Sequence, residues 1–544
     1  MHFRFLLKFH FLVWIFLIGF SYLALSQGKA IPFEEFFGVN SVRESDSSWL
    51  NDQYAVSKYH RIFGMDSYVF GGEEIVESFS KNIFKVNPEI PHDAYPDDRY
   101  GFNPARGGKG FDFDYFLRKL KQNGIRAIPV LAKNLLYTSI EEDNTVHVWT
   151  KPNDKGGDPS DPMSYRAFSS FLFQFTARYG SKEVPGELLK LSQGNQLLSG
   201  LDLVYAIEPG NEMNKDWFTE KQNMSPMEMA AFLSASIDGH MGKMGPGHGI
   251  RQADADMKIV FPSPHDIDSE YLLEVRRLII EMRREAKDLG YPQDPMVNMV
   301  MTAHYYPVKG GSQRYAKGGQ DFDQSDMLAK SLEFTSLIRE NFTEAEIWLT
   351  ETGYDKMTDP KRSRVASPIN SQDPVRNGMP NERAQARNLA KLVLGMSGSG
   401  FDRIFTFTLK DPQFRNHRAY GSTFLSSGLC YKDGEKALSW FALSNIRASL
   451  KGYHYKESYV RNNIRFTVYQ KAEQKIIALW STDAEKKQIS LNFEKDGMIR
   501  IMDLGSSNGG LTDKKISNRN AEIAVTDFPK LVFISNQRIV QIDH

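Results

Sequence analysis

The sequence predicts an α/β protein, a (β/α)8 TIM barrel followed by a smaller antiparallel β-sandwich. Short apolar runs alternate with amphipathic segments over most of the chain, and eight such runs can be counted. Strands alternating with helices indicate a parallel sheet, and eight strands close a TIM barrel. The pattern fits an open doubly wound sheet as well, so the choice of a barrel depends on the motifs below. After Trp440 the helical spacing gives way to short alternating runs, which indicate the sandwich.

The first 26 residues have the layout of a secretory signal peptide. Arg4 and Lys8 precede an apolar run from residue 11 to 25, and Ala24-Leu25-Ser26 fits a small-x-small cleavage site. An uncleaved anchor is the alternative, but the run is short for a membrane span of roughly 20 residues. We therefore expect an exported protein, secreted or periplasmic and of bacterial type, with no stable membrane span after cleavage.

The barrel is expected over residues 27–450. Its predicted strands are Phe36–Asn40, Tyr59–Phe63, Arg126–Leu131, Leu203–Ile207, Lys258–Phe261, Met299–His304, Ile347–Thr350 and Arg403–Phe407. The clearest helices are predicted at Phe111–Gln122, Tyr165–Tyr179, Leu328–Arg339 and Arg383–Met396. A further helix, Trp440–Leu450, leads out of the barrel.

The sandwich is expected over residues 451–544. Its predicted strands are Ile464–Tyr469, Ile476–Trp480, Ile489–Phe493, Ile499–Asp503 and Leu531–Ser535, separated by Asn- and Gly-rich turns. No helical segment continues the barrel pattern here, so we interpret this part as a separate module.

Composition excludes several classes of function. Lys+Arg and Asp+Glu both total 67, and no long basic block occurs, which argues against a nucleic-acid partner. Cys430 is the only cysteine, so neither an intrachain disulfide nor a cysteine-based metal site can form. The 12 histidines are scattered, without the clusters typical of a metal enzyme. We expect neither a metal nor a cofactor.

Two carboxylates stand where a barrel would place its chemistry. Functional residues of TIM barrels collect at the C-terminal ends of the strands. The fourth predicted strand leads into Asn211-Glu212, and the seventh leads into Glu351. The sixth ends at His304-Tyr305. Two carboxylates at one barrel mouth are the minimum equipment for hydrolysis of a glycosidic bond.

At these positions the chain resembles clan A of the glycoside hydrolases, the retaining TIM-barrel enzymes. That clan carries Asn-Glu after strand four and a single Glu after strand seven. The resemblance implies that Glu212 is the acid/base and Glu351 the nucleophile. It also implies that Asn211 binds the sugar 2-hydroxyl, and that His304 or Tyr305 lies near the nucleophile. The resemblance covers about residues 36–440, and the sandwich is similar to the small β-domain that many members append.

Several positions have more than one interpretation. Glu208 is a rival for the acid, although strand alternation is expected to turn it into the barrel. Arg61 could contact the nucleophile or a structural carboxylate. Asn40 could bind a hydroxyl group or form a turn. The predicted strand eight has no Trp, where clan members usually carry one.

The two roles require different surroundings. A nucleophile must stay ionised, so we expect hydrogen-bond donors around Glu351, from His304, Tyr305 or Arg61. An acid must hold a proton near neutrality, so we expect a less polar pocket that raises the pKa of Glu212. The sequence thus predicts a retaining glycoside hydrolase acting on a β-linked polysaccharide or oligosaccharide. The alternative is a non-catalytic glycan-binding protein on a decayed glycosidase barrel.

Overall fold

The computed structural model describes residues 31–42, 56–65, 75–78, 83–86, 102, 104, 112–132, 145–147, 150–154, 156–191, 195–215, 222–371, 373, 380–507, 509–535 and 539–543. The predicted signal peptide lies outside these residues. Within them, no helix combines the length and the apolar character that crossing a membrane requires.

Eight parallel strands form a closed barrel, as predicted. They are β1 (Phe37–Val42), β2 (Tyr59–Phe63), β5 (Arg126–Pro129), β7 (Ala206–Ile207), β8 (Lys258–Val260), β9 (Met299–His304), β10 (Ile347–Thr352) and β11 (Arg403–Thr406). Neighbouring strands follow the order β5-β2-β1-β11-β10-β9-β8-β7. Parallel bridges from Ala127 to Val204 and from Val130 to Glu208 join the first and last of these, which closes the sheet.

One apolar layer of the barrel interior is filled by side chains from every strand but one. Seven strands each contribute one buried apolar residue to a single cluster: Tyr59, Ile128, Ala206, Val260, Val300, Trp348 and Phe405. At this level β1 carries Gly38, where a Cβ atom would lie 2.4 Å from the Phe405 ring. The missing side chain on β1 therefore makes room for that ring. Because both faces of each strand are covered, the strands are continuous apolar runs in the sequence.

Helices surround the barrel. The longer ones are α4 (Phe113–Gln122), α5 (Arg166–Tyr179), α6 (Pro226–Asp238), α8 (Ser269–Met282), α9 (Met327–Asn341), α10 (Glu382–Gly395) and α11 (Leu438–Ser449), and the short ones are α2 (Phe33–Phe36) and α7 (Ile250–Ala253). A small separate sheet contains β3 (Ile75–Ser78), β4 (Ile83–Val86) and β6 (Thr145–His147). The five predicted helices are confirmed. The structure adds α6, which begins with a capping box between Ser225 and Glu228, and α8.

The C-terminal part is an antiparallel sandwich, as predicted. Its strands are β12 (His454–Arg461), β13 (Ile464–Lys471), β14 (Gln474–Ser481), β15 (Lys487–Phe493), β16 (Gly497–Asp503), β17 (Leu511–Ile516), β18 (Asn520–Val525), β19 (Lys530–Ile534) and β20 (Ile539–Asp543). One sheet has the order β12-β13-β14-β19-β16-β17 and the other β18-β15-β20. The sequence did not predict β12, β17, β18 and β20. β12 and β17 are mostly exposed and lack an apolar stripe.

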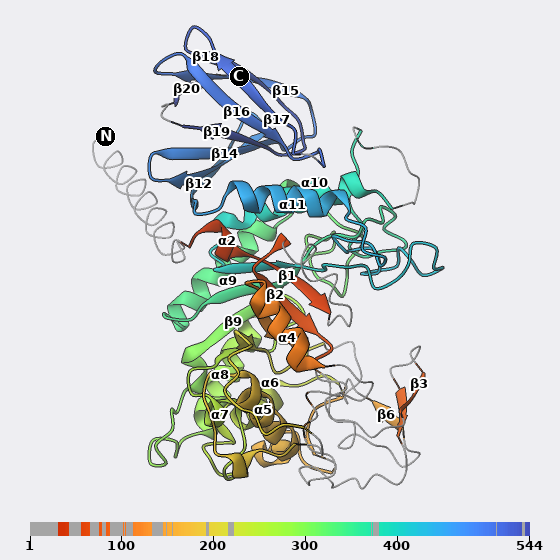
Figure 1. Cartoon of the computed structure of the whole chain (residues 1–544), viewed down its shortest axis with the longest axis vertical. Helices are drawn as coiled ribbons and strands as arrows, with labels where there is room; N and C mark the ends of the chain where they lie inside the picture. Colours follow the sequence, from red (N-terminus) through yellow and green to blue (C-terminus); the bar gives the residue numbers. More distant parts are fainter. Residues whose placement is uncertain are drawn as a thin grey trace, which may run out of the picture.

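The sandwich packs against the barrel through α10 and α11, which lie between the two parts (Figure 1). Buried residues of both parts belong to one continuous apolar cluster. Within this contact the buried carboxylate of Asp323 accepts hydrogen bonds from Arg465 Nε and Trp480 Nε1, both at 2.7 Å. The sandwich is therefore joined to the barrel by a shared core as well as by polar contacts.

Candidate active site

Two glutamates meet at the C-terminal mouth of the barrel. Glu351 is the fifth residue of β10, and Glu212 follows β7 on a short loop. The main chain of Glu212 is left-handed, with φ of 50°, and its N–H donates to Ser263 O at 2.8 Å. A left-handed conformation is strained for a residue of this size, and such strain is concentrated at functional sites. The left-handed conformation directs the Glu212 side chain towards Glu351.

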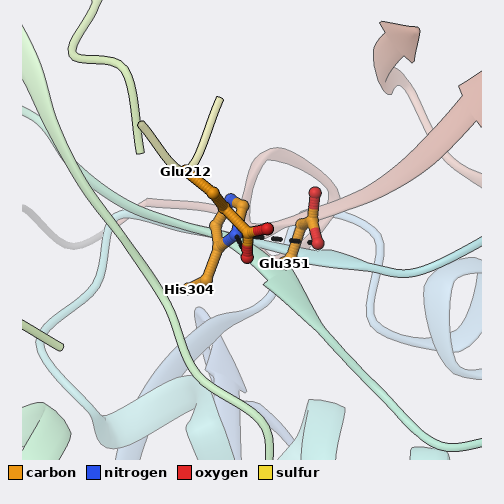
Figure 2. Close-up of side chains that lie close together, drawn as sticks. All are labelled: Glu212, His304 and Glu351. Carbon is orange, nitrogen blue, oxygen red and sulfur yellow. Dashed lines mark hydrogen bonds and ion pairs between the residues drawn. The ribbon is translucent and has the colours of Figure 1, made fainter. Parts of the chain in front are cut away.

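The His304 ring contacts both carboxylates (Figure 2). Its Nδ1 atom is 2.8 Å from Glu212 Oε1 and 3.6 Å from Glu351 Oε2. One ligand atom from each of these three residues lies within 4.8 Å of the other two. His304 is paired with Glu351 in the register of β9 and β10, which places both side chains on the same side of the sheet. Its Nε2 atom is buried and has no hydrogen-bond partner among the described residues.

Arg61 on β2 connects Glu351 to the barrel interior. This fully buried guanidinium donates from Nη1 to Glu351 Oε1 at 2.8 Å and to Asn40 Oδ1 at 2.9 Å. It also donates to Glu208 through Nε and Nη2, at 2.6 and 2.9 Å. Both interpretations of Arg61 therefore apply, because it contacts Glu351 and a structural carboxylate together.

Glu208 is fully buried, whereas Glu212 lies at the mouth. Besides Arg61, Glu208 accepts a hydrogen bond from Ser263 Oγ at 2.8 Å. All its contacts are with groups of the barrel interior, where a substrate would not reach it. Glu212 is thus the better placed of the two for proton transfer.

Asn40 and Asn211 both bind Arg61. Asn40 lies opposite Arg61 in the register of β1 and β2, and its Nδ2 donates to Thr350 O at 2.9 Å. It is an interior residue and not a turn former. Asn211 Oδ1 accepts from Arg61 Nη2 at 2.6 Å. The asparagine before Glu212 is therefore held in place by a residue of β2, two strands away around the barrel.

The tyrosine beside Glu351 is Tyr306, not Tyr305. Tyr306 donates its hydroxyl hydrogen to Glu351 Oε2 at 3.0 Å, whereas Tyr305 donates to Asp326 Oδ1 at 2.5 Å. Successive residues of an extended chain point to opposite sides. Because His304 faces the site, Tyr306 faces it too and Tyr305 faces away. Of the two residues expected near the nucleophile, His304 is the one that lies beside Glu351.

Glu212 is surrounded by hydrogen-bond donors. Gln313 Nε2 donates to Glu212 Oε1 at 2.8 Å, beside His304, and Lys215 Nζ forms an ion pair with Oε2. Burial alone would raise the pKa of Glu212, but the charge of Lys215 and the contact with His304 outweigh it and hold the pKa below its usual range. The expected apolar pocket with a raised pKa is therefore not what surrounds Glu212.

Lys215 and Gln313 were not among the predicted site residues. Lys215 follows Glu212 by three residues, a spacing that could have indicated an ion pair. Gln313 comes from the glycine-rich loop after β9, where nothing in the local pattern relates it to Glu212. Its amide orientation is fixed by a second hydrogen bond, to His265 O at 2.7 Å.

Aromatic rings stand beside Glu351 where β11 ends. Phe407 contacts Phe424 with ring centroids 5.3 Å apart, and Phe424 contacts Tyr306 at the same distance. Phe63 contacts Phe407 at 6.3 Å. Phe424 has a left-handed main chain, with φ of 68°. At the end of β11, where the resemblance to clan A implies a Trp, the chain thus has the half-buried Phe407.

The geometry of Glu212, His304 and Glu351 alone would allow a metal ion. The surrounding charges oppose one, because Lys215 pairs with one carboxylate and Arg61 with the other. A cation would have to enter beside both positive groups, which is costly in a buried site. The donor set therefore fits carboxylate chemistry better than metal binding.

No family model matches the chain, and no curated protein matches it. Among solved structures, it is similar to a family 39 glycoside hydrolase from Bacteroides cellulosilyticus, with 13% identity and a TM-score of 0.53, covering 93% of this chain and 83% of that one. It is also similar to a glucosidase from Croceicoccus marinus, with 12% identity and a TM-score of 0.50, covering 95% and 98%. The resemblance to clan A is thereby confirmed for the fold.

Proposed function

We propose that the protein is a retaining glycoside hydrolase acting on a β-linked polysaccharide or oligosaccharide. The observation that carries the proposal is the closeness of Glu212 and Glu351, whose nearest ligand atoms lie within 4.8 Å across the barrel mouth. Retaining enzymes hold their two carboxyl groups about 5–5.5 Å apart, whereas inverting enzymes leave about 6.5–9.5 Å for a water molecule. The fold shared with the two glycoside hydrolases named above agrees with this function.

In the first step, a carboxylate oxygen of Glu351 attacks the anomeric carbon while the glycosidic C–O bond breaks. Glu212 gives a proton to the leaving oxygen, and a glycosyl ester forms on Glu351. In the second step Glu212 takes a proton from water, the water oxygen attacks the anomeric carbon, and the ester bond breaks. Arg61 and Tyr306 each donate a hydrogen bond to Glu351 and so favour its ionised form before attack.

Kinetics of two variants test this proposal. On a panel of β-linked glycans and aryl β-glycosides, Glu351→Ala and Glu212→Ala should both lose activity. Azide should rescue Glu351→Ala with a glycosyl azide of inverted configuration, and rescue Glu212→Ala with one of retained configuration. Full activity in either variant would overturn the assignment. Glycan binding by a wild-type protein that cleaves nothing would favour the non-catalytic alternative.

We further propose that the protein is exported, as the predicted signal peptide over residues 1–26 suggests. N-terminal sequencing of the mature protein from cell fractions tests this. A mature chain beginning near Gln27 outside the cytoplasm is the expected result.

A further inference from the structure

The loop that follows β9 is basic, although the chain as a whole has no net charge. Residues 305–320 contain Lys309, Arg314 and Lys317 and no acidic residue, against totals of 67 basic and 67 acidic residues in the chain. All three basic side chains are exposed. A positive loop on a neutral protein indicates a local partner of negative charge.

The loop that follows β10 adds to this charge. It carries the exposed residues Lys361, Arg362 and Arg364. The two loops are in contact, because Gly319 N donates to Ala366 O at 2.9 Å. We call these six side chains the basic rim: Lys309, Arg314, Lys317, Lys361, Arg362 and Arg364. Within the part of the chain that the structure describes, no ion pair is formed by the other five, Lys309, Lys317, Lys361, Arg362 and Arg364, whereas Arg314 has a partner.

The basic rim reaches Glu212 through Gln313. Gln313 belongs to the first of the two loops and donates to Glu212 Oε1, while Arg364 Nη1 donates to Gln313 O at 3.4 Å. Arg364 is thus one residue away from the acid/base position. Lys215 approaches Glu212 through its other oxygen, Oε2. Lys215 therefore contacts Glu212 directly, whereas Arg364 is connected to it through Gln313.

The positions of Lys215 and Arg364 indicate which part of the substrate these side chains face. In the proposed reaction Glu212 protonates the oxygen of the leaving group, so groups around Glu212 face the leaving-group side of the cleaved bond. The loop after β10 also reaches the aromatic rings near Tyr306, because Arg364 N donates to Thr423 Oγ1 at 3.0 Å and Val365 belongs to the apolar cluster against which Phe407 and Phe424 pack. Positive charge and apolar surface therefore lie next to each other at this part of the mouth.

We propose that the substrate is an acidic glycan, whose leaving-group portion carries a carboxylate or sulfate that Arg364 and Lys215 bind. This substrate class rests on the proposed hydrolase function for its orientation. An arginine is suited to carboxylate and sulfate oxygens because its planar donors can bind two of them together. The remaining basic rim would attract a polyanionic chain to the mouth.

Binding of the substrate anion by Lys215 explains how Glu212 can take up the proton that it must donate. In the structure its carboxylate faces the donors Lys215, Gln313 and His304, with Asp266 and Glu351 as nearby acidic groups. A substrate anion would draw the Lys215 ammonium group away from Glu212 Oε2. That oxygen could then hold a proton. Binding of the acidic group thereby favours the protonated acid at the moment when it is needed.

The test compares matched glycans with matched variants. Initial rates are measured on uronate-containing, sulfated and neutral β-linked oligosaccharides, with wild-type protein, Arg364→Gln and Lys514→Gln. Lys514 is exposed on β17 of the sandwich, so its variant controls for the loss of one positive charge. Calorimetry with the inactive variant Glu351→Gln measures binding of the same oligosaccharides, and of a single-stranded oligonucleotide, at two salt concentrations.

We expect one of the two acidic series to be cleaved at least about tenfold better than the neutral one, with Arg364→Gln losing about tenfold in kcat/KM on it, as for one charge-assisted hydrogen bond. Lys514→Gln should behave as wild type. The series that is preferred identifies the anion as carboxylate or sulfate. Binding to Glu351→Gln should show the same preference and weaken with salt.

Two other outcomes overturn the inference in different ways. Cleavage of neutral glycans at equal rates, unchanged in Arg364→Gln, would refute the acidic substrate and leave the hydrolase function intact. Binding of the oligonucleotide as tightly as of the acidic glycans would show a general polyanion site. If nothing is cleaved, the hydrolase function fails, and calorimetry with wild-type protein and Arg364→Gln still decides whether acidic glycans bind through Arg364.

Discussion

Arg61 and Glu208 form a buried pair in which the guanidinium donates two hydrogen bonds, at 2.6 and 2.9 Å, to the two oxygens of one carboxylate. Neither side chain is exposed to solvent. The same guanidinium reaches Glu351 and Asn211, so the pair fixes the group that orients both halves of the candidate site.

The first prediction concerns this pair. Glu208→Gln should lower the free energy of unfolding by about 3 kcal/mol, because it removes one of the two carboxylates that compensate the buried charge of Arg61 and leaves only Glu351 among the described residues. Urea denaturation measures it, with Glu187→Gln at an exposed position as the control for loss of one carboxylate. Equal midpoints for the two variants would show that Glu208 is not needed to hold Arg61.

The second prediction separates the two adjacent tyrosines. Tyr306→Phe should reduce kcat/KM by about tenfold or more, since it removes a hydrogen bond to Glu351 while keeping the ring. Tyr305→Phe changes a hydroxyl that bonds Asp326, so its kcat/KM should stay within about twofold of wild type. The reverse ranking would contradict the assignment of Tyr306 to the site.

The third prediction tests the packing inside the barrel. Gly38→Ala should destabilise the protein by about 1–3 kcal/mol, because its Cβ would lie 2.4 Å from the Phe405 ring in a filled interior. Gly186→Ala is the matched control, since an added Cβ there meets no atom within 4 Å. Thermal unfolding of both variants measures the difference, and a stable Gly38→Ala protein would mean that Phe405 can move.

The fourth prediction concerns Asp355, a fully buried residue after β10. Burial raises its pKa to about 7, despite hydrogen bonds from Ser363 Oγ and Phe424 N. In the unfolded state, the carboxyl group of Asp355 ionises near pH 4. Between about pH 4 and pH 7 the unfolded state therefore loses this proton while the folded state keeps it, so stability falls as pH rises.

Asp355→Asn should remove that part of the decline, because the amide mimics the protonated acid. Between pH 4 and pH 7, the free energy of unfolding of wild type should fall by about 4 kcal/mol more than that of Asp355→Asn. Asp256→Asn, whose parent side chain is 74% exposed, serves as the control. Parallel pH profiles for wild type and Asp355→Asn would refute the raised pKa.

The fifth prediction concerns Lys215. Lys215→Gln removes the positive charge that favours the ionised form of Glu212, so the pKa of Glu212 should rise. The protonated form is competent for the first step, and the alkaline limb of kcat/KM should move up by about one pH unit or more. Lys215→Arg, which keeps the charge, should leave the limb in place. If the alkaline limb of kcat/KM moves in neither variant, a group other than Glu212 governs it.

The sequence predicted eight parallel strands because they are buried on both faces and therefore appear as continuous apolar runs. The choice of a closed barrel depended on the motifs at the strand ends. The edges of the sandwich escaped prediction for the opposite reason. β12 and β17 are mostly exposed, and exposed strands leave little apolar pattern to recognise.

At the site, the sequence by itself determined that Glu212 and Glu351 follow two strands of one barrel, because strand ends can be located from apolar runs alone. Only the tertiary structure decided which neighbours reach them. Tyr306 rather than Tyr305 meets Glu351, since the direction of a side chain depends on register and pleat. Gln313 meets Glu212 across 101 residues, a contact that no local pattern encodes. Strand ends are properties of short segments, whereas the charges around a carboxylate depend on distant loops that only folding brings together.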